Sequence, residues 1–199
     1  MEAHVYPIEI PLRDGRTVVV RQMVPGDAKP MLEFFRGLPE IDRRYLRNDV
    51  TQPRTVERYV TNEDDDWLVG IAVEHENRII GTATLERERH RWATHVADVR
   101  FVVARDWQGQ GIATALAGIL VRHAMSIGLE KIVAHVVDGQ AGAERALERL
   151  GFVREAVLRR HVQDITGRKR DLHVLTNDAS HIWERMEHMV ADYQPIREH

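Results

Sequence analysis

The chain has 199 residues, the length of one medium-sized domain, and its 43% hydrophobic and 30% charged residues are typical of a soluble globular protein. Its 28 lysines and arginines against 31 aspartates and glutamates give a formal net charge of −3, so no overall basic excess attracts nucleic acid or an anionic membrane. The absence of cysteine excludes disulfides, thiolate nucleophiles and iron–sulfur clusters. No apolar run approaches the roughly 18 residues of a membrane span, and the polar first residues do not form a signal peptide, so we expect a cytoplasmic protein.

Hydrophobic patterning predicts strands and helices in a defined order. Asp14-Gly15 between two β-prone runs indicates a hairpin, because glycine tolerates a positive φ. In chain order, the expected elements are a hairpin over 8–20, three short helices between 27 and 60, a second hairpin over 67–85, a strand over 95–103, a helix over 112–127, a strand over 131–137, a helix over 140–150, a third hairpin over 152–175 and a last helix from 177. The strands over 95–103 and 131–137 are separated by a helix and should run parallel, within a mixed sheet of the α/β or α+β class.

A glycine-rich segment, Gln108-Gly109-Gln110-Gly111-Ile112-Ala113-Thr114, joins the strand over 95–103 to the next helix. Its glycines carry no Cβ, so a ligand can approach the backbone, and the free N–H groups of the first helical turn attract a phosphate or pyrophosphate. The segment is neither a P-loop nor the dinucleotide-binding fingerprint. The alternative interpretation is a plain strand-to-helix turn whose glycines permit tight packing.

The segment resembles the signature of the GNAT superfamily of N-acetyltransferases, Arg/Gln-x-x-Gly-x-Gly/Ala. A second family signal, Glu148-Arg149-Leu150-Gly151-Phe152, ends the helix over 140–150, and the order of elements matches over about residues 17–176. The resemblance implies one acyl-CoA N-acyltransferase domain over 1–176, built on a mostly antiparallel sheet of six to seven strands. The remaining residues, 177–199, would form a helix that packs on this domain or lies at a homodimer interface.

The resemblance also implies how acetyl-CoA, the co-substrate of this family, would bind. Backbone amides from Gly109 to Thr114 would hold the pyrophosphate, and the amide of Gln108 would add a hydrogen bond. The strand over 95–103 would pair with the pantetheine arm in a slot between two splayed strands. The implied cofactor-binding residues are Phe101, Val102, Val103, Gln108, Gly109, Gln110, Gly111, Ile112, Ala113, Thr114 and Asp138.

Asp98 is the candidate general base. A lysine side chain, with a pKa near 10.4, is mostly charged at neutral pH, so a base assists its attack on a thioester. The family often places a glutamate on the strand before the phosphate loop, and Asp98 lies on that strand. The alternative is a structural ion pair of Asp98 with Arg100, two residues along on the same face. The family's usual acid, a tyrosine, is replaced by Leu147, which leaves the proton source for the departing thiolate open.

The nature of the acceptor stays open between a protein lysine and a small-molecule amine. Residues 12–16 and 43–47 resemble, more weakly, the catalytic domain of bacterial protein lysine acetyltransferases, whereas the hairpin over 161–172 resembles small stand-alone acetyltransferases. A non-catalytic CoA-binding sensor or interaction module on the same fold is the competing class. The eleven histidines show no metal-ligand spacing, so no metal is expected, and the expected partners exclude nucleic acid and membranes.

Overall fold

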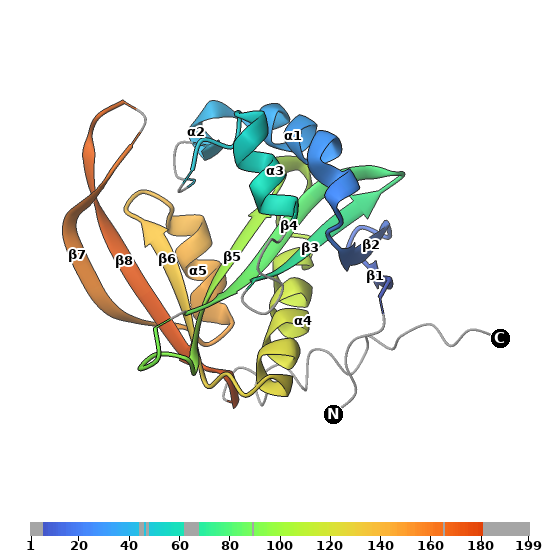
Figure 1. The fold of residues 1–199 in the computed structure, drawn as a ribbon. Coiled ribbons are helices and arrows are strands. Elements are labelled where there is room, and N and C mark those ends of the chain that lie inside the picture. Colours follow the sequence, from blue (N-terminus) through green and yellow to red (C-terminus); the bar gives the residue numbers. More distant parts are fainter. Residues whose placement is uncertain are drawn as a thin grey trace.

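A computed structural model describes residues 6–43, 46, 48–61, 68–88, 90–164 and 166–180. One 8-stranded sheet runs through it in the order β1-β2-β3-β4-β5-β6-β8-β7 (Figure 1). The strands are β1 (Ile8–Pro11), β2 (Thr17–Gln22), β3 (Leu68–His75), β4 (Arg78–Arg87), β5 (Val96–Val103), β6 (Lys131–Val137), β7 (Val153–Gln163) and β8 (Lys169–Asp178). The expectation of six to seven strands is therefore wrong, because the N-terminal hairpin β1–β2 pairs with β3 and widens the sheet.

Helices join these strands in the predicted order. They are α1 (Ala28–Gly37), α2 (Glu40–Arg43), α3 (Pro53–Thr61), α4 (Ile112–Ser126) and α5 (Ala141–Arg149), with 3-10 turns η1 (Pro25–Asp27) and η2 (Arg105–Trp107). The mixed α/β fold predicted from the sequence is confirmed. No helix within the described ranges has both the length and the apolar character needed to span a membrane.

The strands β5 and β6 run parallel, as predicted, whereas all other neighbours in the sheet are antiparallel. Their pairing is short, since only Val96–Asp98 faces Lys131–Val133. Both strands then continue, to Val103 and Val137, without further pairing between them. We call the space between these two diverging stretches the β5–β6 slot.

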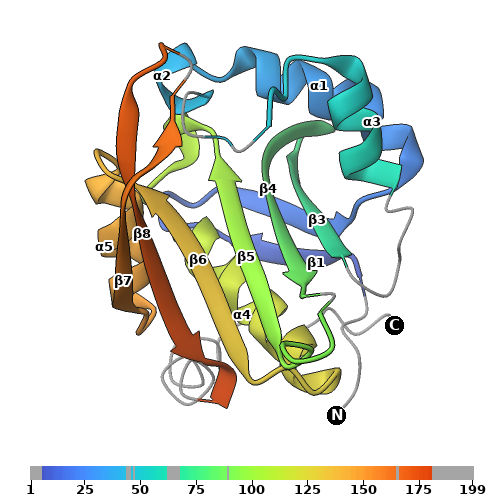
Figure 2. The ribbon, with the colours of Figure 1, turned by 60° about the vertical axis from the view of Figure 1, so that its left-hand side comes forward.

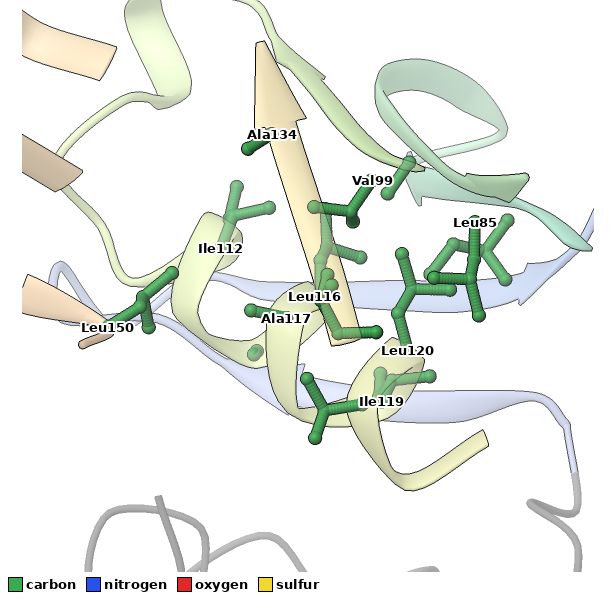
Figure 3. Packing of buried hydrophobic residues seen from close by; sticks show 14 of the residues in the cluster. Leu85, Val99, Ile112, Leu116, Ala117, Ile119, Leu120, Ala134 and Leu150 are labelled. Atoms are coloured by element: carbon green, nitrogen blue, oxygen red, sulfur yellow. The ribbon is translucent and has the colours of Figure 1, made fainter. Parts of the chain in front are cut away.

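One face of the sheet carries the main core, beneath α4 and α5. The apolar stripe of α4, which includes Ile112, Leu116 and Leu120, is buried against Leu85 and Val99 of the sheet (Figure 3). Burial of such a side chain contributes about 1.5–3 kcal/mol, so this stripe fixes α4 beneath the central strands. The N-terminus of α4 is thereby held beside the end of β5.

The opposite face is covered by α1 and α3, which lie over β3 and β4 in Figure 2. Their apolar residues, including Met31, Phe35 and Val56, form a second core with Ala72 and Ile79. The rings of Phe35 and Tyr59 meet edge to face at 5.7 Å.

The C-terminal boundary differs from the prediction. Strand β8 continues through Asp178, so Asn177 and Asp178 extend the ladder with β6, and the helix predicted from 177 begins at 179, with Asp178 accepting from the N–H of Ser180. Residues 181–199 lie outside the described residues, and so does the segment 62–67, which contains the acidic run 63–66. The predicted packing or dimer role of the C-terminal segment therefore stays a prediction.

Candidate active site

The glycine loop, residues 108–114, adopts a conformation that requires glycine. Gly109 and Gly111 have φ values of +76° and +98°, in the left-handed region that side chains rarely adopt. Within the described part of the chain, and leaving aside the two flanking residues, no heavy atom lies within 4 Å of a Cβ added at either position. Tight packing therefore does not explain these glycines, and the backbone conformation does.

The first turn of α4 presents unpaired backbone donors to this loop. The first helical bond runs from the N–H of Ala115 to the carbonyl of Gly111, at 3.0 Å, so the N–H groups of Ile112, Ala113 and Thr114 precede the helical ladder. No side chain of the described residues caps this end. These donors and the helix dipole would favour an anion at the loop, so the binding of a phosphate group there stays a prediction.

The loop is braced by its own chain on several sides. Gln108 donates from Nε2 to the carbonyl of Val103, at 2.9 Å, so its amide supports the loop in addition to any ligand contact. The guanidinium of Arg16 stacks 3.6 Å from the ring centroid of Trp107, and His75 contacts the same ring. Arg105 forms a two-pronged ion pair with Asp42 of α2, which raises the pKa of Arg105.

The two edges of β5 differ in which peptide groups they present. The N–H of Ala104 donates to Ile80 and the N–H of Glu88 donates to Val96, both at 3.0 Å. Because peptide groups alternate in direction along a strand, even-numbered residues of β5 face β4 and odd-numbered residues face the slot. Phe101 therefore presents its N–H and C=O groups to the slot, and Val103 presents its N–H, since the carbonyl of Val103 already accepts from Gln108. The peptide groups of Val102 belong to the ladder with β4. The prediction that Val102 pairs with the ligand through its backbone is wrong for this reason.

Asp98 lies where the slot closes, opposite Val133, the last paired residue of β6. Its Oδ1 is 2.8 Å from Nδ1 of His135, and the two side chains are 16% and 27% exposed. Arg100, the partner expected for a structural ion pair with Asp98, instead binds Glu86 of β4, with 2.6 Å between Nη2 and Oε2. That alternative is therefore wrong.

His135 is a residue that the sequence interpretation missed. Alternation along β6 buries Ile132 and Ala134 in the main core and leaves Val133 and His135 on the opposite face. The face shared with Asp98 follows from the parallel register of β5 and β6. The sequence did contain a signal for this contact. Once β5 and β6 are expected to run parallel, a histidine on β6 near the level of Asp98 is a candidate partner for it on the same face of the sheet.

Comparison with known proteins identifies the family. Residues 33–152 match the model of the acetyltransferase (GNAT) family. The chain belongs to this family. It is 31% identical over 160 residues to the acetyltransferase Pat of Mycolicibacterium smegmatis, which covers 77% of this chain and 46% of Pat. It is 28% identical over 171 residues to the probable N-acetyltransferase YjcK of Bacillus subtilis, covering 81% of this chain and 93% of YjcK.

Solved GNAT structures share the fold. The RimJ protein of Mycobacterium smegmatis, solved with CoA-disulfide, superposes with a TM-score of 0.74 at 20% identity, covering 93% of this chain and 97% of RimJ. The chain spans about half the length of Pat, so Pat carries further sequence beyond the shared acetyltransferase domain. GNAT enzymes use acetyl-CoA as co-substrate, and the domain described here is an acetyltransferase domain of that family.

Two departures from the GNAT pattern have clear structural settings. Leu147, at the position of the family's tyrosine, is buried on α5 in the main core, where it contributes packing and offers no proton. Asp138 directly follows β6 and is exposed at the open end of the slot, and its N–H donates to the carbonyl of Asp171 at 3.0 Å. Within the described residues, no group of three or more histidines and carboxylates is arranged to hold a metal ion.

Proposed function

We propose that this chain moves an acetyl group from acetyl-CoA to the primary amine of a protein lysine, by direct attack in a ternary complex. The observation that carries the proposal is the β5–β6 slot, which ends at the glycine loop on one side and at Asp98 on the other. A slot into which backbone peptide groups are directed, next to a helix N-terminus, suits a pantetheine arm attached to a pyrophosphate.

In this proposal the donors of the glycine loop hold the pyrophosphate. The pantetheine arm then lies along β5 and pairs with the peptide groups of Phe101 and Val103. The stretch from Val103 to Asp98 measures about 17 Å at about 3.3 Å per residue, so the arm runs from the loop toward the closed end of the slot. The thioester accordingly points to the region of Asp98.

The chemistry needs a neutral amine beside the thioester carbonyl. The nitrogen lone pair attacks the carbonyl carbon, and the C–S bond breaks as the carbonyl re-forms. Binding both substrates together supplies much of the rate, because it replaces a bimolecular encounter by a positioned one. Asp98 lies at this end of the slot, where a base is needed to take the proton from the ammonium.

A protein lysine is favoured as the acceptor by the resemblance of residues 12–16 and 43–47 to the catalytic domain of bacterial protein lysine acetyltransferases. A small-molecule amine is the alternative acceptor. The choice between acceptors would depend on α1, α2 and the segments around them. Helix α2 is joined to the turn before the glycine loop by the Asp42–Arg105 pair.

Calorimetric titration with acetyl-CoA tests the first half of the proposal. We expect micromolar binding, and no binding would overturn the role of the glycine loop and with it the proposed function. Release of CoA thiol is then measured with a peptide whose one amine is an internal lysine, and with spermidine as the small-amine probe. Turnover with the peptide supports the proposal, turnover with spermidine alone favours a small-molecule acceptor, and binding without turnover identifies a CoA sensor.

A further inference from the structure

His135 and Asp98 meet on the face of the sheet opposite the main core, at the closed end of the slot. Asp98 is the last residue of β5 that pairs with β6, and His135 lies two residues beyond its partner Val133. The distance of 2.8 Å between Nδ1 and Oδ1 brings the imidazole of one slot wall onto the carboxylate of the other. Both side chains remain partly exposed, so a substrate can reach them.

The contact with Asp98 determines which nitrogen of His135 is free to react. The contact is an ion-pair contact whose alignment falls outside hydrogen-bond geometry. The negative charge of the carboxylate, so close to Nδ1, favours a neutral imidazole with its hydrogen on Nδ1 and its lone pair on Nε2. Among the described residues, no hydrogen bond or ion pair involves Nε2 of His135. Nε2 is thus the ring nitrogen that a substrate can contact.

Among the described residues, the charged side chains on either side of this pair are paired with each other. On the β4 side, Glu86 and Arg100 neutralise each other, and on the β7 side, Lys131 and Glu155 do the same. The residue opposite His135 on β8 is Val174, which is uncharged.

We propose that His135, oriented by Asp98, carries the proton in acetyl transfer, first as the base for the amine and then as the acid for the thiolate. This inference rests on the proposed function. Nε2 accepts one proton from the acceptor ammonium, and the amine lone pair forms the C–N bond while the carbonyl π electrons move to oxygen. The tetrahedral nitrogen releases a second proton to water. The carbonyl then re-forms, the C–S bond breaks, and the imidazolium returns its proton from Nε2 to the sulfur of CoA.

The balance of acid strengths favours an imidazole over a carboxylate for this task. Proton transfer from a lysine ammonium, with a pKa near 10.4, is uphill by about four powers of ten to a reference imidazole and by more than six to a reference aspartate. Asp98 is thus better suited to orient and stabilise the imidazolium than to take the proton itself. The same division of roles between a histidine and an aspartate operates in serine proteases.

In the second proton transfer of this proposal, His135 acts as the acid for the CoA thiolate, a part that Leu147 cannot play. Tyr59 carries a phenol on this face of the sheet, but its hydroxyl lies 3.4 Å from that of Thr82 on β4, on the side of β5 away from the slot. Burial raises the pKa of Tyr59. His135 lies on the slot wall itself, so one group serves both proton transfers.

The protonation of His135 can be read directly. Long-range ¹⁵N–¹H correlation spectra of the wild-type protein should show the neutral ring with its hydrogen on Nδ1. In Asp98→Asn the preference for this form should be lost. A wild-type ring with its hydrogen on Nε2 would overturn the proposal, since Nε2 then has no lone pair to accept a proton.

Kinetics test the catalytic role, with CoA-thiol release measured on the single-lysine peptide or spermidine, whichever the wild type acetylates. His135→Gln should lower kcat by about 100-fold or more while the Kd for acetyl-CoA stays within about twofold. Asp98→Asn should lower kcat in the same direction. Added imidazole should restore part of the activity of His135→Ala. The control His173→Gln changes a histidine of β8 that contacts Glu144 of α5, and it should keep wild-type kcat.

The outcomes separate this inference from the proposed function. If the wild type and His135→Gln turn over equally, the acetyltransferase function stands and the role of His135 is overturned. If the wild type binds acetyl-CoA but acetylates neither probe, the proposed function fails and the proton-transfer role fails with it. If His135→Gln loses affinity for acetyl-CoA as well as kcat, the histidine is a structural part of the slot and the proposal is overturned.

Discussion

The two edges of β5 are built from the same residues and serve opposite purposes. On the β4 edge the ladder is continuous from Gly81 opposite Val103 to Arg87 opposite Ala97. On the β6 edge it stops at Asp98. One strand thus stabilises the sheet through its even-numbered peptide groups and offers its odd-numbered ones to a ligand.

The slot persists because each of its walls is anchored from behind. Strand β5 is held by β4 over its whole length, and β6 is paired with β8 from Lys131 opposite Asp178 to Val137 opposite Leu172. Neither wall depends on the other for its hydrogen bonds beyond Asp98. The extension of β8 past the predicted boundary therefore matters for the slot, since it secures the start of β6.

Proline variants at the adjacent positions Val102 and Val103 should show the largest difference between the β4 edge and the slot edge of β5. Val102→Pro removes an N–H from the β4 ladder and leaves the partner carbonyl on Thr82 unsatisfied within a buried strand, which costs about 1–3 kcal/mol before any strain. We expect a fall in Tm of about 5–10 °C. Val103→Pro removes an N–H that faces the slot, so its Tm should fall less and its Kd for acetyl-CoA should rise. Thermal unfolding and calorimetry measure both, and equal losses of Tm would show that the two edges are not distinct.

The glycine loop provides the next largest effect. Gly111→Val forces a β-branched residue to a φ of +98°, at a strain of about 1–3 kcal/mol, and directs its side chain over the proposed pyrophosphate site. The Kd for acetyl-CoA should rise about tenfold or more. Gly142→Ala is the control, because Gly142 has ordinary φ on α5 and open space around an added Cβ. The control should bind acetyl-CoA normally. Normal binding by Gly111→Val would mean that the loop is only a turn.

The fold was largely predictable because its signals are local or periodic. The Asp14-Gly15 turn, the apolar stripe of α4 and the parallel order of β5 and β6 follow from residue types and spacing. The partner of Asp98 was not predictable in the same way, since it depends on register. Arg100 is near Asp98 in sequence, but the antiparallel register of β4 and β5 brings Glu86 within reach of Arg100. The parallel register of β5 and β6 brings His135 to Asp98. The strand count was underestimated because edge pairing of the N-terminal hairpin is a tertiary choice.

Removing the contact between Arg16 and Trp107, which supports the glycine loop, should have a smaller effect on stability and on acetyl-CoA binding. Arg16→Ala removes the guanidinium from the face of Trp107, a contact of about 0.5–1 kcal/mol at an exposed site. We expect a Tm lower by about 2–4 °C at most and a Kd for acetyl-CoA raised a few fold, because η2 precedes the loop directly. Arg13→Ala, on the same hairpin and with the same change in charge, should alter neither. Matching effects of the two variants would indicate a general charge effect instead of a brace.

The smallest effect separates two carboxylates that face each other across β4 and β5. Glu86 is opposite Asp98 in register, but it pairs with Arg100 within the closed ladder, where the two side chains are 45% and 31% exposed. Such a pair contributes about 0–1 kcal/mol, so Glu86→Gln should change Tm by only a few degrees and leave kcat within about twofold. Asp98→Asn, the same chemical change one strand away, should lower kcat strongly. If both variants lost kcat alike, the negative charge of this face as a whole, and not the contact of Asp98 with His135, would govern the proton transfer.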